Sequence, residues 1–207
     1  AGVLGENSKL HDLWLEHFEC GIWVGDYVEA DKMKYTDKLT VSNSRIRNNF
    51  ADGVNFAQGT KNSKVQNSNV RGNGDDGLAT FASKAVLEIK ENVNGEERVR
   101  YIHTESKPAK NNAFLNNTVE LTWRASGIAL HGGANHRIEG KLVKDITSGP
   151  GLRVSTVFPG YNFDDNQNIS IKRNLLIKTG TDNDFYGNAL ASIHFEKLYG
   201  EMKKMNV

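Results

Sequence analysis

Three aspartates, Asp52, Asp75 and Asp76, have side chains and a spacing that would suit acid–base catalysis. They lie in two stretches, residues 43–56 and 67–80, that repeat one another 24 residues apart. The repeat aligns Asp52 with Asp76 and puts Asp75 beside them. Carboxylates so close cannot all ionise cheaply, so one tends to keep its proton near neutral pH while its neighbours remain bases. An acid beside bases is the division of roles that inverting glycoside hydrolysis requires.

The same repeat predicts the fold, because self-similarity at a period of about 20 to 50 residues is typical of stacked-repeat proteins. The repeated motif is a glycine followed by alternating apolar residues, and it occurs at Gly21, Gly53, Gly77, Gly127 and Gly151. A period of two is that of a half-buried strand, whereas Asn, Gly and Ser interrupt every helical pattern nearby. We therefore expect an all-β, right-handed parallel β-helix (a pectate-lyase-like solenoid), in which each glycine opens a short strand.

One interval between these glycines is 50 residues, which predicts an excursion from the coil. Residues 84–110 are more charged than their flanks and favour a hairpin-like insertion that turns near Asn94 and Gly95. The 23 asparagines of the chain suit stacked turns, because Asn tolerates left-handed backbone angles and its amide can form ladders. We expect residues 1–207 to be one catalytic β-helix domain and, since an open end would expose strand edges, a fragment of a longer helix.

Composition narrows the classes of protein. With 38% hydrophobic residues and no long apolar run, the chain has enough apolar content for a core, and we expect no membrane span. A net charge of +1 without a basic, aromatic-rich stripe argues against nucleic acid. Cys20 is the only cysteine, so an internal disulfide is excluded and we expect a small buried residue there. No metal site and no cofactor are expected.

The local pattern leaves the direction of the aspartates open. Strict strand alternation would turn Asp52 and Asp76 inward with Val54 and Leu78, where they would cap stacked turns. The glycine after each aspartate permits a bend that would instead turn the carboxylate outward, into a groove. Coils about 4.8 Å apart would then bring the carboxylates together.

Four segments resemble the catalytic β-helix of glycoside hydrolase family 87, the α-1,3-glucanases or mutanases: residues 12–27, 41–60, 70–79 and 153–161. The most specific part is Ala-Asp-Gly followed 23 and 24 residues later by Asp-Asp-Gly. The tail from residue 182 to 207 matches the family only loosely.

The resemblance implies a role for each aspartate. Asp76 would be the general acid, while Asp52 and Asp75 would hold and activate the water for inversion. It also implies a secreted, endo-acting enzyme that degrades α-1,3-glucan, such as mutan or fungal-wall glucan, without a cofactor.

Further residues are candidates for sugar contacts, because flat aromatic rings suit sugar faces and guanidinium groups suit sugar hydroxyls. The expected substrate contacts are Trp23, Asp26, Asn55, Gln58, Trp123, Arg124 and Arg153. Stacking on a neighbouring coil and surface ion pairing are the structural alternatives for these aromatic and arginine side chains. His131 is expected to be a surface histidine outside the catalytic group.

Three functions remain open at this point. The first is an inverting α-1,3-glucan hydrolase, and the second is a dextranase-like β-helix enzyme that cleaves another glucan. The third is a non-catalytic, carbohydrate-binding β-helix with its aspartates in turn ladders. A polysaccharide lyase is disfavoured, because uronate substrates require a positively charged groove. In each case we expect a monomer whose partner is a polysaccharide, with no nucleic acid and no membrane.

Overall fold

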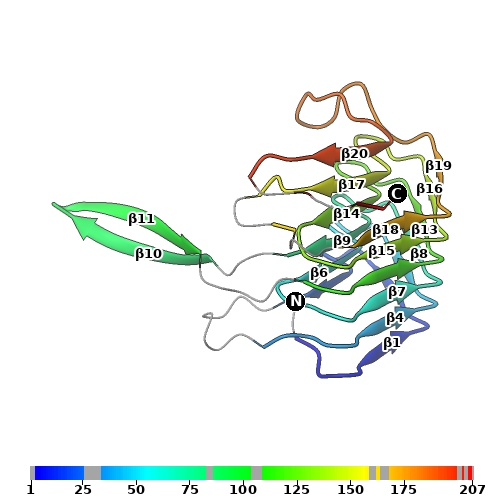
Figure 1. Cartoon of the computed structure of the whole chain (residues 1–207), viewed down its shortest axis with the longest axis horizontal. Helices are drawn as coiled ribbons and strands as arrows, with labels where there is room; N and C mark the ends of the chain where they lie inside the picture. Colours follow the sequence, from blue (N-terminus) through cyan, green and yellow to red (C-terminus); the bar gives the residue numbers. More distant parts are fainter. Residues whose placement is uncertain are drawn as a thin grey trace.

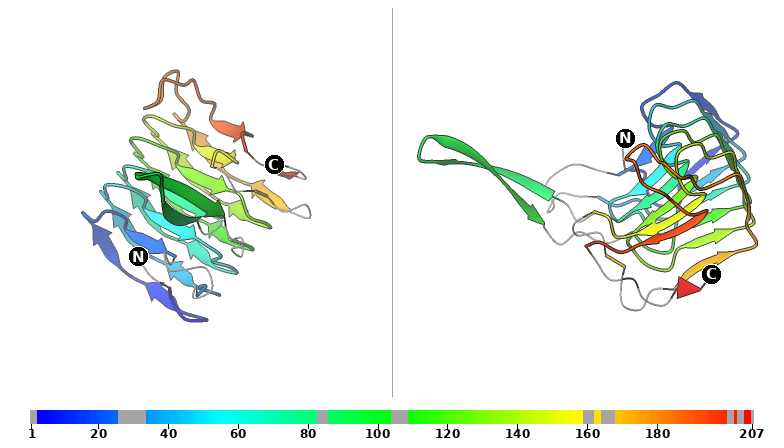
Figure 2. Two further views of the ribbon diagram at one scale, coloured as in Figure 1. Left: turned by 90° about the vertical axis from the view of Figure 1, so that its left-hand side faces the viewer. Right: turned by 90° about the horizontal axis from the view of Figure 1, so that it is seen from above.

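The computed structural model describes residues 3–25, 34–82, 86–103, 109–158, 162–163, 168–199, 202 and 205–206. Three parallel sheets wind around one core, and a coil of three short strands repeats along the axis (Figures 1 and 2). This is the right-handed parallel β-helix that the repeat predicts. The described part of the chain contains no helix long and apolar enough to cross a membrane.

Each sheet takes one strand from every coil. Sheet 1 runs in spatial order through β1 (Lys9–His11), β4 (Thr40–Ser42), β7 (Lys64–Gln66), β12 (Ala113–Leu115), β15 (Arg137–Glu139), β18 (Ile169–Lys172) and β21 (Met205–Asn206). Sheet 2 runs through β2 (Trp14–Glu16), β5 (Arg45–Arg47), β8 (Asn69–Arg71), β13 (Thr118–Glu120), β16 (Leu142–Lys144) and β19 (Leu175–Ile177). Sheet 3 runs through β3 (Ile22–Val24), β6 (Val54–Ala57), β9 (Leu78–Phe81), β14 (Ile128–His131), β17 (Leu152–Ser155) and β20 (Ile193–Glu196).

The core consists of columns of apolar side chains that stack from coil to coil. In sheet 3, Val54 pairs with Leu78, which confirms the stacking expected from the 24-residue repeat. Leu78 pairs in turn with Ile128, and Ile128 with Leu152, and all four side chains are fully buried. A coil cannot bury its own apolar face alone, so each one depends on its neighbours for stability.

The turn from sheet 1 to sheet 2, which we call the short corner, has two residues in every coil. It occupies residues 12–13, 43–44, 67–68, 116–117, 140–141 and 173–174. The first residue is left-handed, with φ of 52° at both Asn43 and Asn67, a conformation that Asn tolerates well. The second residue points inward. Asn117, for example, accepts the Ser68 N–H at 2.8 Å and donates to the Val65 carbonyl at 3.0 Å.

The turn from sheet 2 to sheet 3, which we call the wide corner, is longer and varies in length. It occupies residues 17–21, 48–53, 72–77, 121–127, 145–151 and 178–192. It too begins with a left-handed residue, such as Asn48 with φ of 53° or Leu121 with φ of 57°. The residues that follow lead into the strands of sheet 3, and some are buried, such as Asn49, whose Nδ2 donates to Asn73 Oδ1 of the next coil at 2.8 Å.

The charged segment between β9 and β12 forms an antiparallel hairpin, β10 (Val86–Val93) and β11 (Glu96–His103). Asn94 and Gly95 form its turn, with φ of 57° and 88°, as the sequence predicts. Figures 1 and 2 show this ribbon extending away from the stacked coils. The regular coils are therefore interrupted without loss of register, because β9 still pairs with β14 beyond the insertion.

Candidate active site

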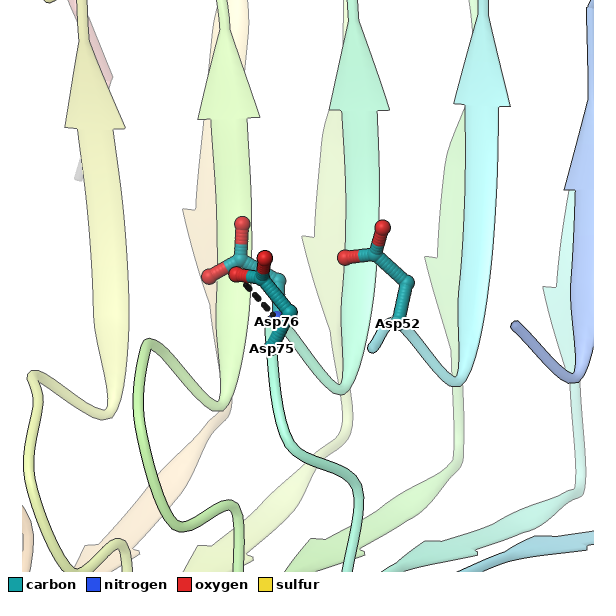
Figure 3. A group of neighbouring side chains, drawn as sticks. All are labelled: Asp52, Asp75 and Asp76. Carbon is teal, nitrogen blue, oxygen red and sulfur yellow. Dashed lines mark hydrogen bonds between the residues drawn. The ribbon is translucent and has the colours of Figure 1, made fainter. Parts of the chain in front are cut away.

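Three aspartates meet at the wide corner, where two adjacent coils enter sheet 3. Asp52 precedes β6 and Asp76 precedes β9, and the two coils are joined by a hydrogen bond from the Gly53 N–H to the Asp76 carbonyl at 3.1 Å. One carboxylate oxygen from each of Asp52, Asp75 and Asp76 lies within 4.8 Å of the others. Figure 3 shows the three side chains reaching into one shared space. The clustering expected from the repeat is confirmed.

Glycines after the aspartates decide which way the carboxylates point. A Cβ at Gly53 would collide with the Gly77 carbonyl and would come within 2.6 Å of Val70, so this position faces the crowded interior. Gly77 is equally confined, with a Cβ that would lie 2.5 Å from Val119. Since glycine and the following residue both face inward, strict alternation is broken and the preceding aspartate is free to turn outward.

Asp52 is only 5% exposed and accepts a hydrogen bond from Asn55 Nδ2 at 3.2 Å. Burial, together with the charges of Asp76 and Asp75, raises the pKa of Asp52 well above its ordinary value. The neighbouring amide opposes this shift without cancelling it. Asp52 is therefore a carboxyl group that retains a proton more readily than an exposed aspartate.

Asp76 is buried as deeply but behaves in the opposite way. Its Oδ1 accepts the Ser126 N–H at 2.9 Å, and its Oδ2 lies 3.2 Å from Nε2 of His131. Burial by itself would raise the pKa of Asp76, but the hydrogen bond and charge of His131 and the Ser126 N–H outweigh it, and the pKa lies below its ordinary value. Asp76 is held as the ionised member of the trio.

Asp75 lies nearest to solvent, with a side chain that is 41% exposed. Its Oδ1 accepts the Asp76 N–H at 3.0 Å, the dashed contact of Figure 3, and its Oδ2 lies 3.3 Å from Nη2 of Arg124. Burial and the charge of Asp76 raise the pKa of Asp75, although Arg124 acts against the rise. The trio thus combines one carboxyl group whose pKa is lowered with two whose pKa values are raised.

A hollow of about 550 Å³ opens over the carboxylates, and we call it the carboxylate hollow. It is lined by Phe18, Glu19, Cys20, Trp23, Ala51, Asp52 and Asp75. Cys20 is partly exposed here rather than buried as expected, since it faces this opening. Burial and the charge of Asp52 raise the pKa of Cys20 to about 11, so the thiol is not a nucleophile at neutral pH.

The arrangement suits acid–base chemistry on a small neutral ligand, because the site holds side by side carboxyl groups whose pKa values are shifted in opposite directions. Oxygen atoms this close would also suit a hard cation, but an acidic cluster alone does not identify a metal site. Retaining glycosidases place their two carboxyl groups about 5–5.5 Å apart and inverting ones about 6.5–9.5 Å. The nearest oxygens in this trio are closer than either range, so the separation does not choose between the two routes.

A family model described as the α-1,3-glucanase catalytic domain D2 matches residues 2–200. The chain belongs to this family. The family that the four sequence segments suggest is therefore confirmed. No curated protein sequence matches the chain at a significant level.

Solved structures agree with this assignment. The catalytic domain of Agl-KA is similar with a TM-score of 0.85 and 43% identity, over 99% of this chain and 32% of that chain. An aspartate-to-alanine variant of a family 87 α-1,3-glucanase in complex with nigerose is similar with a TM-score of 0.68 and 26% identity, over 91% of this chain and 30% of that chain. The catalytic unit of the thermostable α-1,3-glucanase from Streptomyces thermodiastaticus strain HF3-3 has a TM-score of 0.70 and 24% identity, over 93% of this chain and 31% of that chain. At this identity, the similarity shows the fold alone. This chain spans about a third of the length of these relatives.

The structure brings several of the expected substrate contacts to the carboxylates. Trp23 lines the carboxylate hollow, and Asn55 bonds to Asp52. Arg124 bonds to Asp75, and Trp123 lies next to it in the wide corner. These four residues belong to three coils, and the hairpin insertion separates Trp123 and Arg124 in sequence from the other two.

Other expected contacts lie elsewhere. Gln58 is buried just past the far end of β6, where its N–H bonds to the Phe81 carbonyl at 3.0 Å. Arg153 pairs with Glu196 at 3.0 Å, which matches the ion-pair alternative for this side chain. Asp26 lies outside the described residues.

His131 was expected at the surface, and the structure corrects this. It is only 5% exposed, because the rings of Phe81 and Phe158 lie 6.1 and 5.2 Å from its own. Its Nδ1 lies 2.7 Å from the buried Ser155 hydroxyl while Nε2 faces Asp76. An ionised Asp76 accepts a hydrogen bond from Nε2, and the Ser155 hydroxyl is the partner of Nδ1. The one sequence signal was the outward position of His131 on its strand.

Proposed function

We propose that this chain supplies the acid–base centre of an endo-acting glycoside hydrolase that cleaves α-1,3-glucan with inversion. The observation that carries the proposal is the cluster of Asp52, Asp75 and Asp76 beside an open hollow, in which the pKa of Asp76 is lowered and those of Asp52 and Asp75 are raised. Membership of the α-1,3-glucanase family supports the linkage, and a relative at 26% identity has been seen with nigerose bound. We place the reaction outside the cell, where a glucan of polymer length is found.

The contacts of the three carboxylates support particular roles. Asp76 is kept ionised by His131 and the Ser126 N–H, which suits a base that activates water. Asp52 lies beside it and shares the task of holding that water. Asp75 is the most exposed of the three and has a raised pKa, which suits an acid that reaches the leaving oxygen.

These roles exchange Asp75 and Asp76 relative to the expectation drawn from the family resemblance, in which Asp76 is the acid. The exchange rests on the lowered pKa of Asp76, because a general acid must carry a proton at the working pH. The assignment from the resemblance stays a prediction that the same experiment tests.

The experiment compares polymer with an α-nigero-oligosaccharyl fluoride, whose leaving group needs no protonation. Asp75→Asn should lose at least about 100-fold in kcat on α-1,3-glucan yet keep most activity on the fluoride, since only the acid is missing. Asp76→Asn should lose activity on both substrates. The reverse pattern would restore Asp76 as the acid.

Two further measurements test the reaction itself. Proton NMR of the first minutes of hydrolysis should show the β-anomer from this α-linked polymer, and an initial α-anomer would exclude inversion. Parallel incubation with insoluble α-1,3-glucan and with dextran separates the linkage specificities. Release of reducing ends from dextran alone would favour a dextranase-like enzyme, and release from neither would favour a non-catalytic binding protein.

A further inference from the structure

Three exposed aromatic rings lie in a row along the wide corner, and we call them the aromatic row: Phe18, Phe50 and Trp123. Their exposed fractions are 55%, 60% and 43%. The acid–base mechanism uses none of them. Large apolar side chains gathered at one place on a surface mark a contact site more often than scattered ones do.

The row is built by the stacking of the coils. The Phe50 N–H bonds to the Phe18 carbonyl at 2.9 Å, so these two residues occupy equivalent places on adjacent coils. Gly74 holds that place on the next coil, and a Cβ there would collide with the Phe50 carbonyl and lie 2.5 Å from Trp123 Cζ2. The missing side chain lets Trp123 reach across the third coil to Phe50, with ring centroids 6.4 Å apart.

Arg124 ties the row to the carboxylates. Its guanidinium carbon lies 5.9 Å from the Phe50 ring centroid and 5.8 Å from that of Trp123, while Nη2 contacts Asp75 at 3.3 Å. Cation–π contacts of this kind hold the rings and the guanidinium in a fixed relation. The aromatic row is therefore rigidly placed relative to the proposed acid.

A second hollow of about 460 Å³ opens over the row, and we call it the aromatic hollow. Besides the three rings, polar side chains of His17, Glu19 and Asn48 line it. Phe18 and Glu19 also line the carboxylate hollow, so the two openings adjoin. Rings with polar groups at their edge match a pyranose, which has apolar C–H faces and a rim of hydroxyl groups.

We propose that the aromatic row is a second glucan-binding surface, which holds glucose units of the same chain at a distance from the bond that is cleaved. The inference rests on the proposed function, and the occupant follows from the continuity of the two hollows through Phe18 and Glu19. Binding there adds affinity for long chains. A short substrate that fills only the carboxylate hollow gains nothing from Phe50 and Trp123, which line the aromatic hollow alone.

The test measures kcat/KM on reduced α-1,3-gluco-oligosaccharides of increasing length and binding to insoluble α-1,3-glucan by co-sedimentation. Truncating a central aromatic contact weakens binding about 5- to 30-fold. Phe18→Ala and Trp123→Ala should therefore remove the rise of kcat/KM with length by about this factor. Phe50→Ala, whose ring lines the aromatic hollow and not the carboxylate hollow, should do the same and should leave kcat on the shortest cleaved oligosaccharide within about twofold of the unsubstituted protein.

The matched control is Trp14→Ala, because Trp14 is 60% exposed on β2 and lines neither hollow. It should keep the full dependence on length. Trp123→Phe guards against a folding defect, since a smaller ring in the same place should retain part of the dependence. Thermal unfolding of each variant reports its fold.

The outcomes separate the two proposals. Cleavage of glucan with an unchanged length dependence in Phe18→Ala and Trp123→Ala would overturn the aromatic row as a glucan site and leave it as a contact for another protein. Absence of cleavage by the unsubstituted protein would overturn the proposed function. In that case, co-sedimentation that is lost in both variants but kept in Trp14→Ala would still support the row.

Discussion

The short corner and the wide corner begin with the same left-handed residue, yet only the wide corner gathers chemistry. At the short corner, one left-handed residue and one inward residue connect two strands in every coil. The inward side chains bond to backbone groups of neighbouring coils: Ser68 Oγ accepts the Ser44 N–H, and Asn117 accepts the Ser68 N–H and donates to the Val65 carbonyl. At the wide corner, additional residues precede sheet 3, and three of them are the carboxylates.

The difference between the corners lies in their length, because the backbone of each bonds from coil to coil. A corner whose polar groups are all paired within the stack has no side chain free to meet a ligand, and substitutions there act on stability. The wide corner also bonds from coil to coil, as at Phe50 and Gly53, but it has more residues than a tight turn, and the side chains of some of them can serve a site. The β-helix thus supplies a rigid frame, and the length of one corner decides where function is placed.

The largest expected contrast comes from one substitution at each corner. Asp76→Asn should lower kcat on α-1,3-glucan by about 10³-fold or more, because the ionised base is lost, while the free energy of unfolding changes little. Steady-state rates and denaturant unfolding of the same preparation measure both quantities.

Asn117→Ala at the short corner should lower the free energy of unfolding and leave kcat nearly unchanged. It leaves the Ser68 N–H and the Val65 carbonyl buried without their partner, which costs about 1–3 kcal/mol for each unsatisfied group. The value of kcat should stay within about twofold. If Asn117→Ala lowered kcat as much as Asp76→Asn does, the two corners would not divide stability from chemistry.

At the short corner, Lys141 is an inward side chain whose polar group is not paired. Its effect on the free energy of unfolding should be the next largest. It is 3% exposed, its Nζ has no hydrogen-bond partner, and burial lowers its pKa to about 6. An unfolded lysine keeps its proton to about pH 10.4. Between pH 6 and 10 the unfolded state therefore binds more protons, and the free energy of unfolding should rise with pH.

Lys141→Met should remove this dependence and raise the free energy of unfolding at pH 7 by about 1–4 kcal/mol, since a buried ionisable group is replaced by an apolar one. Urea unfolding at pH 6, 7, 8 and 9 measures the slope. The exposed Lys9→Met is the control and should keep it. A slope retained in Lys141→Met would show that another group causes the pH dependence.

His131 tests the ionisation of Asp76 in the wide corner. His131→Leu removes the hydrogen bond that lowers the pKa of Asp76, so that pKa should rise. A base works only above its pKa, and the acid limb of kcat/KM should therefore move to higher pH, by about one unit. Ser155→Ala keeps the His131 ring but removes the hydroxyl beside its Nδ1, and it should shift the acid limb of kcat/KM by less. A limb that stays in place would remove His131 from the mechanism.

The smallest expected effect concerns Leu121, which opens the wide corner in its coil with φ of 57°. A branched side chain is unfavourable in the left-handed region by roughly 1–2 kcal/mol, whereas Asn is tolerated there. Leu121→Asn should raise the free energy of unfolding by about 1 kcal/mol with unchanged kcat. Asn67→Leu at the short corner should lower it by a similar amount. If neither variant differed from the unsubstituted protein in its free energy of unfolding, backbone strain would not affect stability at either corner.

The coil period, the strands opened by Gly53 and Gly77, and the hairpin turn at Asn94 and Gly95 were all predictable from the sequence. Each depends on local rules: a repeat brings equivalent residues into one column, alternation defines a strand, and a turn needs residues that accept positive φ. The meeting of Asp52 with Asp76 follows from the repeat alone. The family was inferred from the resemblance of four segments, residues 12–27, 41–60, 70–79 and 153–161.

Tertiary structure decided the rest. Strand alternation left the direction of Asp52 and Asp76 open, and the crowding of Gly53 and Gly77 against the next coil resolved it. The contact of His131 with Asp76 crosses 55 residues and a long insertion, and it exists because coils stack and because rings of distant segments cover the outward face of sheet 3. A local pattern records which residues alternate, but the ionisation of a carboxyl group depends on what other coils place beside it.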